Sequence, residues 1–150
     1  MQQIAPHDLH RQIVENTGEA VIFAGSDGRI RLWNASAERI FGWSAAEAIG
    51  QSLDLIVPEK QRGRHWDGWN RVMETGVTRY ASDLLAVPAM RKDGARISIE
   101  FTVALIRDAG GAIAGVAAVM RDVTERFQRD RELRAKVVDL EAKLASATAR

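Results

Sequence analysis

One long helix is predicted over the stretch Val57-Pro-Glu-Lys-Gln-Arg-Gly-Arg-His-Trp-Asp-Gly-Trp-Asn-Arg-Val-Met-Glu-Thr-Gly76. Pro58 and Glu59 suit its first turn, where a missing N–H costs nothing and a carboxylate meets the positive end of the helix dipole. Gly76 suits its C-terminal cap. An apolar stripe at helical spacing comprises Trp66, Trp69, Val72 and Met73. His65 lies at the edge of this stripe, where it is either an ordinary boundary residue or a ligand that points into a pocket.

Length and composition bound the class of protein. The chain has 150 residues, enough for one domain with a core, and 46% of them are hydrophobic. A net charge of +1 gives no field that would recruit nucleic acid or an anionic membrane. The absence of cysteine excludes disulfides, thiolate metal sites, cysteine nucleophiles and flavin–cysteinyl photochemistry. No apolar run reaches the length of a membrane span and no signal-peptide pattern is evident, so we expect a cytoplasmic protein.

The residues before the long helix predict a hairpin and several short helices. Alternating or continuous apolar runs on either side of a Gly-Ser-Asp-Gly turn predict two antiparallel strands. Asn34 is suited to cap the helix that follows, and Ser44 with Glu47 forms a capping box. The predicted elements are a helical lead-in to Thr17, strands 20–24 and 29–33, and helices 35–41, 44–50 and 52–56.

Three strands and an exit helix are predicted after Gly76. The strands run from Thr78 to about Met90, from Arg96 to Arg107 and from Ile113 to Arg121. The apolar run of the third predicts burial on both faces. The exit helix runs from Thr124 to about Ala147. Its coiled-coil seam of Leu133, Val137, Leu140 and Leu144 covers fewer than two heptads, so dimerisation through it needs help from the domain or from a longer coil.

This order of elements predicts a single α+β domain. Five antiparallel strands form one sheet, and the short helices and the long helix cover one face of it, because an alternating sheet needs a cover. We divide the chain into a helical lead-in (1–17), a central domain (18–124) and a C-terminal signalling or coiled-coil helix (125–150).

The central domain resembles a PAS domain over about residues 8 to 127. The motifs that carry the resemblance, in this order and with these gaps, are Gly25-Ser-Asp-Gly28, Trp33-Asn34, Ala37-Glu-Arg-Ile-Phe-Gly-Trp43, Glu47-Ala-Ile-Gly50, Arg91-Lys-Asp-Gly94 and Arg121-Asp-Val-Thr124. PAS domains are sensory and dimerisation modules with a pocket between the sheet and the long helix. The resemblance therefore implies the PAS fold, a signal-transduction role, and coupling of the sheet to an output helix through Asp122-Val-Thr124.

The closest local resemblance is to haem-binding PAS domains of oxygen-sensing histidine kinases and related sensors. In those proteins a histidine on the long helix, just after a Pro-Glu-x-x-Arg-x-Arg-type segment, binds the haem iron, and His65 stands in that register. The resemblance places Arg71 and Arg79 near the haem propionates. It implies a haem b site with His65 as metal ligand and the following cofactor-binding residues: His65, Trp69, Arg71, Arg79, Leu85, Ile99, Phe101 and Val103.

The chain departs from those oxygen sensors on the distal side of the expected haem. They hold oxygen with an arginine on the strand after the long helix, and this chain has Leu85 there. Related sensors use a methionine two residues earlier, where this chain has Asp83. With no evident donor for oxygen, carbon monoxide or nitric oxide is the expected diatomic ligand, and a redox or haem-sensing role also remains.

Several alternatives stay open. A PAS dimerisation and relay module without haem, with a pocket that is empty or holds a small organic ligand, is the main one, and a flavin-binding domain is a weaker one. Trp66 and Trp69 suit a core role, while His7 and His10 suit solvated positions and lack a third metal ligand. No catalytic or phosphate-cradling arrangement is evident, so we expect no enzyme. The expected partners are a second copy, bound through the terminal helices, and an output domain or partner kinase or regulator outside this chain.

Overall fold

The computed structural model describes residues 1–149, so Arg150, the last residue of the predicted 125–150 segment, lies outside the described residues. A five-stranded antiparallel sheet has the strand order β2-β1-β5-β4-β3. The strands are β1 (Ala20–Gly25), β2 (Ile30–Trp33), β3 (Leu85–Met90), β4 (Arg96–Arg107) and β5 (Ile113–Asp122). The helices are α1 (Pro6–Asn16), α2 (Ala35–Phe41), α3 (Ala45–Ala48), α4 (Glu59–Thr75) and α5 (Thr124–Thr148), with 3-10 turns η1 (Leu53–Leu55) and η2 (Arg79–Ala81).

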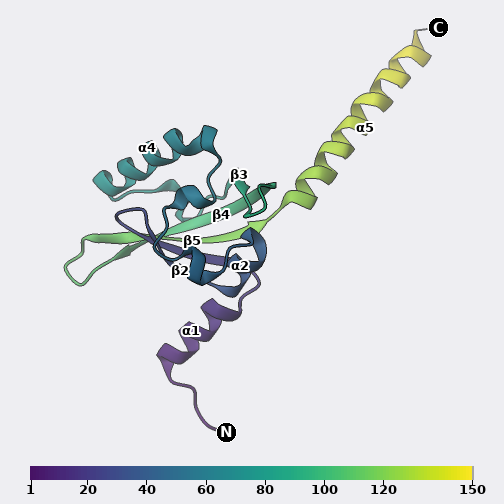
Figure 1. Ribbon diagram of the computed structural model, residues 1–150. Helices are drawn as coiled ribbons and strands as arrows, with labels where there is room; N and C mark the ends of the chain where they lie inside the picture. The colour runs from purple at the N-terminus through teal and green to yellow at the C-terminus, as the bar shows by residue number, and fades with distance from the viewer. Residues whose placement is uncertain (150) are drawn as a thin grey trace.

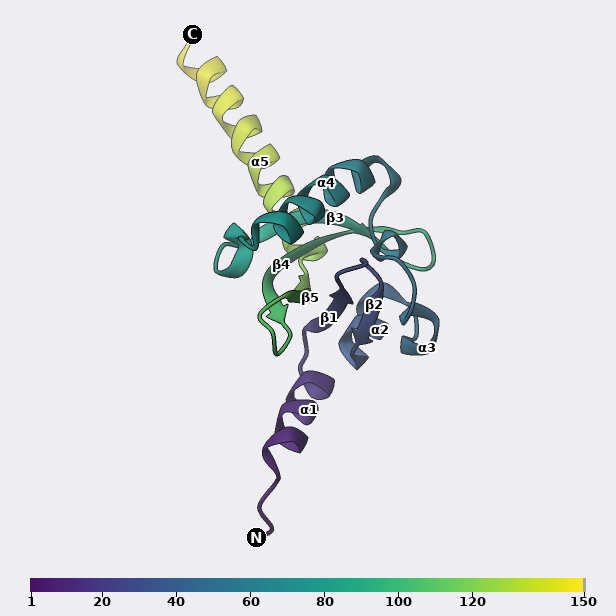
Figure 2. The same cartoon turned by 90° about the vertical axis from the view of Figure 1, so that its left-hand side faces the viewer.

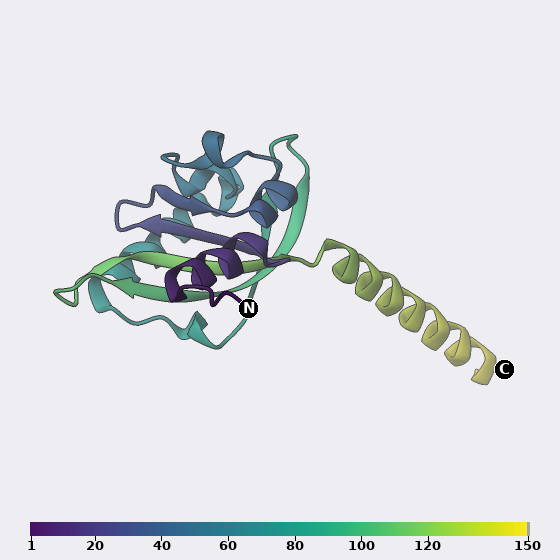
Figure 3. The ribbon, with the colours of Figure 1, turned by 90° about the horizontal axis from the view of Figure 1, so that it is seen from below.

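The helices divide between the two faces of the sheet. The long helix α4 lies over one face, above β4 and β3, and α1 lies on the opposite side (Figures 1 and 2). The view from below shows that α5 leaves the end of β5 and extends far from the rest of the molecule (Figure 3). Within residues 1–149, no helix has the length and apolarity needed to cross a membrane. The predicted α+β architecture, with its five-stranded antiparallel sheet and long covering helix, is confirmed.

The core lies between the inner face of the sheet and its helical cover. Inner-face residues of β1, β4 and β5 stand opposite one another, as in the row Ile22, Ala118 and Val103. Apolar side chains of the helical cover pack against this cluster, including Trp43, Leu55, Val57, Trp66 and Trp69. The sheet and α4 are therefore joined mainly by aromatic and aliphatic packing, which positions the candidate site.

The short helices begin and end where their capping residues predict. The Asn34 Oδ1 accepts hydrogen bonds from the Ala37 N–H and the Val21 N–H, both at 3.0 Å. The Ser44 and Glu47 side chains form the predicted capping box at the start of α3. Asn34 is fully buried and thus fixes the junction between β2 and α2, which agrees with a structural rather than a ligand-binding role.

Two strand predictions are wrong. The strand expected from Thr78 begins only at Leu85, because the Thr78 hydroxyl accepts a hydrogen bond from the Tyr80 N–H at 3.2 Å and starts the turn η2 instead. Arg79 therefore lies on a turn and not on a strand.

The β5 strand is not buried on both faces, since Val119 on its outer face is 40% exposed. The helix α1 does not cover that residue.

Candidate functional site

The helix α4 has the ends predicted from its sequence. Pro58 precedes the first turn, and Gly76 closes the last one in the left-handed conformation, with φ of +67°. The Arg62 guanidinium ties the first turn to the preceding segment by donating to the Val57 carbonyl at 3.0 Å and the Asp54 carbonyl at 3.3 Å. These bonds hold the start of α4 against η1 and so fix the position of the next turn, which carries His65.

His65 is half-buried and lies against two indoles. Its ring centre is 4.6 Å from that of Trp66, with the planes at 76°, and 6.2 Å from that of Trp69. The His65 Nδ1 is buried and has no hydrogen-bond partner within residues 1–149. Burial lowers the pKa of His65 below its usual value, and the negative charge of Asp54 opposes this shift only in part. The imidazole is therefore neutral near pH 7, the form that binds metals.

Trp66 is held in place from two directions. Its indole N–H donates to the Asp54 carboxylate at 2.8 Å. A Cβ on Gly28 would stand only 2.5 Å from the nearest atom of the six-membered ring of Trp66. Gly28 has φ of +76°, so the turn between β1 and β2 both requires a glycine and leaves room for this indole.

Trp69 has a looser attachment. Its indole N–H donates to the Ser26 carbonyl at 3.3 Å, a long bond, and its ring centre is 5.7 Å from that of Trp66. Both tryptophans also pack against the core, as the sequence predicts. The two indoles and His65 thus form one aromatic group between α4 and the turn that joins β1 to β2.

The predicted apolar wall is present on the inner face of the sheet. Ile99 is 3% exposed, and Phe101 and Val103 pack against the same core as the two tryptophans. Leu85 pairs directly with Phe101 in the ladder between β3 and β4, so it belongs to the same face. Asp83 is exposed in the segment before β3. The predicted wall is therefore apolar, and Leu85 brings no hydrogen-bond donor to it.

The two predicted propionate partners lie at the surface. Arg71 is exposed on α4, and within residues 1–149 its side chain has no hydrogen bond or ion pair. The Arg79 guanidinium donates to the Tyr80 hydroxyl at 2.9 Å and lies 5.1 Å from the centre of that ring. Arg71 is free to pair with an anionic group, whereas Arg79 already has a partner within the chain.

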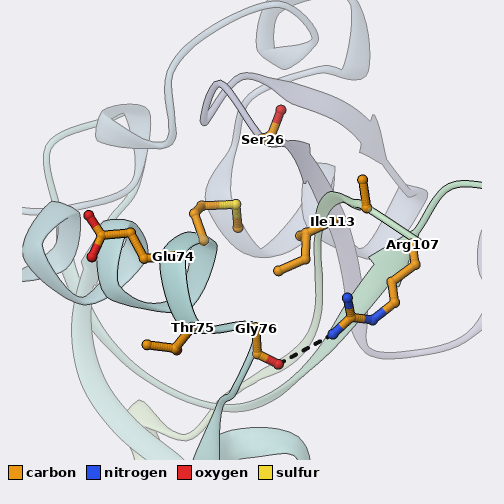
Figure 4. Close-up of a pocket in the computed structure, with 8 residues that line it drawn as sticks. Ser26, Glu74, Thr75, Gly76, Arg107 and Ile113 are labelled. Atoms are coloured by element: carbon orange, nitrogen blue, oxygen red, sulfur yellow. Dashed lines mark hydrogen bonds between the residues drawn. The ribbon is translucent and has the colours of Figure 1, made fainter. Parts of the chain in front are cut away.

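A hollow of about 530 Å³, open to solvent, lies beside the C-terminal end of α4 (Figure 4). It is bounded by Ser26, by the last residues of α4 and by the hairpin between β4 and β5. Arg107 spans it, donating to the Gly76 carbonyl at 3.4 Å and to the Gly111 carbonyl at 3.0 Å. His65 is not among its lining residues, so this hollow is separate from the aromatic group.

The structure brings His65 together with Trp66 and Trp69, packs Trp69 and the apolar wall against the same core, and leaves Arg71 and Arg79 exposed. Sequence reasoning missed Asp54 and Gly28, which hold Trp66. Gly28 belongs to the Gly-Ser-Asp-Gly turn that the sequence predicts. Its contact with the indole of Trp66, 38 positions later, has no signal in the sequence. Asp54 lies 12 positions before Trp66, and no local pattern pairs them.

Comparison with known proteins gives a consistent result. A family model described as a PAS fold matches residues 14–128. Sensor protein FixL of Bradyrhizobium diazoefficiens is 30% identical over 131 residues, which cover 85% of this chain and 26% of FixL. Oxygen sensor protein DosP of Escherichia coli is 25% identical over 116 residues, which cover 77% of this chain and 14% of DosP. The chain thus spans about a quarter or less of the length of these curated relatives.

Among solved structures, a PAS domain from Colwellia psychrerythraea superposes with a TM-score of 0.71. It is 19% identical in sequence, and the superposition covers 81% of this chain and 99% of that domain. At this identity the likeness concerns the fold alone.

Proposed function

This chain belongs to the PAS family of sensory domains, and we propose that it is a haem-containing gas or redox sensor in which the His65 imidazole binds the iron. The observation that carries the proposal is the buried His65 Nδ1, which has no hydrogen-bond partner within residues 1–149. A buried polar atom without a partner costs about 1–3 kcal/mol, and a bond to iron would offset this cost. The similarity to a protein named as an oxygen sensor points in the same direction.

The residues present fit a haem in their chemistry. A neutral imidazole is a good ligand for haem iron, and the lowered pKa of His65 keeps it neutral at physiological pH. The inner faces of β3 and β4 supply apolar contacts from Leu85 and Phe101. Arg71 at the rim has free donors for a carboxylate, which favours a propionate partner there.

Each side chain has a distinct task in the proposed sensor. Bound haem would supply reversible binding of a diatomic gas or a change of redox state. His65 would hold the iron, Arg71 would pair with a propionate, and Arg79 would do so only by giving up its bond to Tyr80. The apolar wall excludes water, and the lack of a donor at Leu85 disfavours oxygen relative to carbon monoxide or nitric oxide. The domain acts without catalysis and passes its state through β5 to α5.

We propose that the sensor works as a homodimer through its terminal helices. The apolar side chains of the α5 seam are all more than half exposed in the single chain, as expected if a second copy covers them. These residues are Leu133, Val137, Leu140 and Leu144. An output domain or partner kinase or regulator would then read the arrangement of the two α5 helices.

A PAS relay module without haem is the second candidate function. The observation that favours it is that Trp66 and Trp69 pack against the core directly beside His65. In this alternative the aromatic group is simply part of the cover of the sheet, and His65 is a boundary residue.

Reconstitution with haemin separates the two candidates. We expect the purified protein to bind one equivalent and to show a Soret band that His65→Ala loses. His10→Ala is the matched control, because His10 is exposed on α1, and it should behave as the wild type. A wild-type protein that retains no haem and shows no Soret band after unbound haemin is removed would exclude the haem proposal.

A further inference from the structure

The orientation of the His65 ring is not set by a hydrogen bond. Histidines that bind metals usually donate their second ring N–H to a carboxylate or carbonyl, and this bond fixes the ring and its tautomer. Within residues 1–149, the His65 side chain makes no hydrogen bond, and its Nδ1 is buried. Some other contact must therefore restrict the rotation of the imidazole.

The Trp66 indole supplies that contact. It meets the His65 ring almost perpendicularly, at 76° and 4.6 Å between centres, which is the favourable edge-to-face arrangement of aromatic pairs. Trp69 is farther away, at 6.2 Å and 38°, and therefore restricts the imidazole less. The position of the Trp66 ring thus decides how far the His65 ring can turn.

The Trp66 ring is itself fixed by residues outside α4. The Asp54 carboxylate accepts its N–H at 2.8 Å, and the bare backbone of Gly28 leaves space for its six-membered ring. The Asp54 carboxylate also lies 3.8 Å from the Arg62 guanidinium, which keeps it beside the first turns of α4. Besides the effect of its charge on the imidazole, Asp54 therefore holds the indole that lies against His65.

We infer that Asp54 and Trp66 are positioning residues, which fix the orientation of the His65 imidazole by holding an indole edge-on against it. The inference rests on the proposed role of His65 in binding iron. Loss of the Asp54 acceptor frees the indole, and the imidazole then turns among several orientations. Because residues that orient a metal ligand typically change metal affinity 10- to 100-fold, Asp54→Ala should weaken haemin binding by about 10-fold.

The first test uses the 150-residue chain without haem. NMR spectra of the His65 ring protons, recorded at about pH 8 so that the imidazole is neutral, report its position relative to the Trp66 ring current. We expect Asp54→Ala to shift these signals. Asp54→Asn should restore them, because its amide oxygen still accepts the indole N–H. Asp67→Ala, which removes an exposed carboxylate of α4 and no aromatic ring, is the control and should leave them in place. Unshifted signals in Asp54→Ala would overturn the inference.

The second test is haemin titration of the same variants. A roughly 10-fold weaker Kd for Asp54→Ala, with the wild-type Kd kept in Asp54→Asn, supports the inference. Equal Kd values for the wild type and Asp54→Ala overturn it while the haem proposal stands. If the wild type binds no haemin, the proposed function fails, and the NMR signals alone then decide whether Asp54 positions the ring.

Discussion

At the scale of single residues, the environment of His65 decides whether this side chain suits the proposed role of iron ligand. Its imidazole is kept neutral by burial, lies against two indoles and has an Nδ1 without a partner. Each property alone is compatible with a core histidine. Together they are the properties that the proposed role of His65 as iron ligand requires, because a buried polar atom without a partner carries a desolvation cost that a ligand would remove.

The first residue-scale prediction concerns Gly28. We expect Gly28→Ala to lower the free energy of unfolding by about 2–4 kcal/mol, because alanine is strained at φ of +76° and its Cβ would overlap the Trp66 ring. Urea unfolding measures this change. Gly68→Ala is the control: a Cβ there meets nothing within 4 Å, so it should stabilise α4 by up to about 1 kcal/mol. Equal effects of the two substitutions would contradict the contact between Gly28 and Trp66.

The second residue-scale prediction concerns pH. Because the pKa of His65 is lowered in the folded protein below the ordinary histidine value of 6.5, the unfolded chain takes up its proton first as the pH falls. The neutral imidazole of His65 therefore contributes its full share to the free energy of unfolding above about pH 6.5. This contribution is lost as the pH falls through the lowered pKa of the folded protein. We therefore expect the free energy of unfolding of the wild type to drop toward acid relative to that of His65→Gln. A difference that is constant with pH would contradict the lowered pKa.

At the scale of elements, the junction between β5 and α5 is where the proposed signal would leave the domain. The Thr124 hydroxyl accepts the Ser98 N–H at 2.9 Å, and the Val123 N–H donates to the Ser98 carbonyl at 2.9 Å. One turn later, the Arg126 guanidinium pairs with Glu100 of β4, which is 9% exposed. The start of α5 is thus attached to β4, the strand that also carries the apolar wall.

Arg126→Ala tests this attachment. It leaves the Glu100 carboxylate nearly buried without its ion pair, so we expect the free energy of unfolding to fall by about 1 kcal/mol, the low end for a charged group, because Arg126 itself is half exposed. Arg129→Ala is the matched control, since its pair with Glu125 is exposed on both sides and should contribute almost nothing. If both substitutions have the same effect in urea unfolding, Glu100 does not anchor α5.

The sequence predicts most elements well because their ends carry local signals. Asn34, Ser44 and Gly76 each begin or end a helix by a contact with nearby backbone, so their effect is visible in sequence. The start of β3 was missed because Thr78 competes for the backbone and forms a turn in a segment whose composition also suits a strand. Arg79 was consequently placed on the wrong kind of element.

At the scale of the whole molecule, apolar side chains remain exposed on the outer face of the sheet and along the terminal helices. Val119 and Ile106 on the sheet are 40% and 41% exposed, and Leu9 and Ile13 on α1 are 42% and 57% exposed. In the proposed homodimer, these surfaces would supply the help from the domain that the short seam of α5 needs.

We expect sedimentation at micromolar concentration to show a dimer that weakens when residues 125–150 are removed. Leu140→Glu should shift the full chain toward monomer, because it places a charge in the seam. Ala142→Glu is the control, since position 142 faces away from the seam on the helix. A monomeric wild type would exclude the proposed homodimer.

The candidate site was predictable only in its outline. The register of His65 and Arg71 follows from the resemblance to haem-binding PAS domains, and the apolar wall follows from the alternation in β4. The contacts of Asp54 and Gly28 with Trp66 join residues that are distant along the chain and share no repeating pattern. Such contacts appear only once the helical cover is packed on the sheet.

The most direct test of the proposed His65–iron bond is rescue by free imidazole. We expect His65→Gly to lose the absorption spectrum of the haemin-loaded wild type and to regain it when imidazole is added, because the small ligand takes the place of the missing side chain. His10→Gly, treated in the same way, should keep the wild-type spectrum throughout. A His65→Gly variant that shows the wild-type haem spectrum without imidazole would contradict the assignment of His65 as the iron ligand.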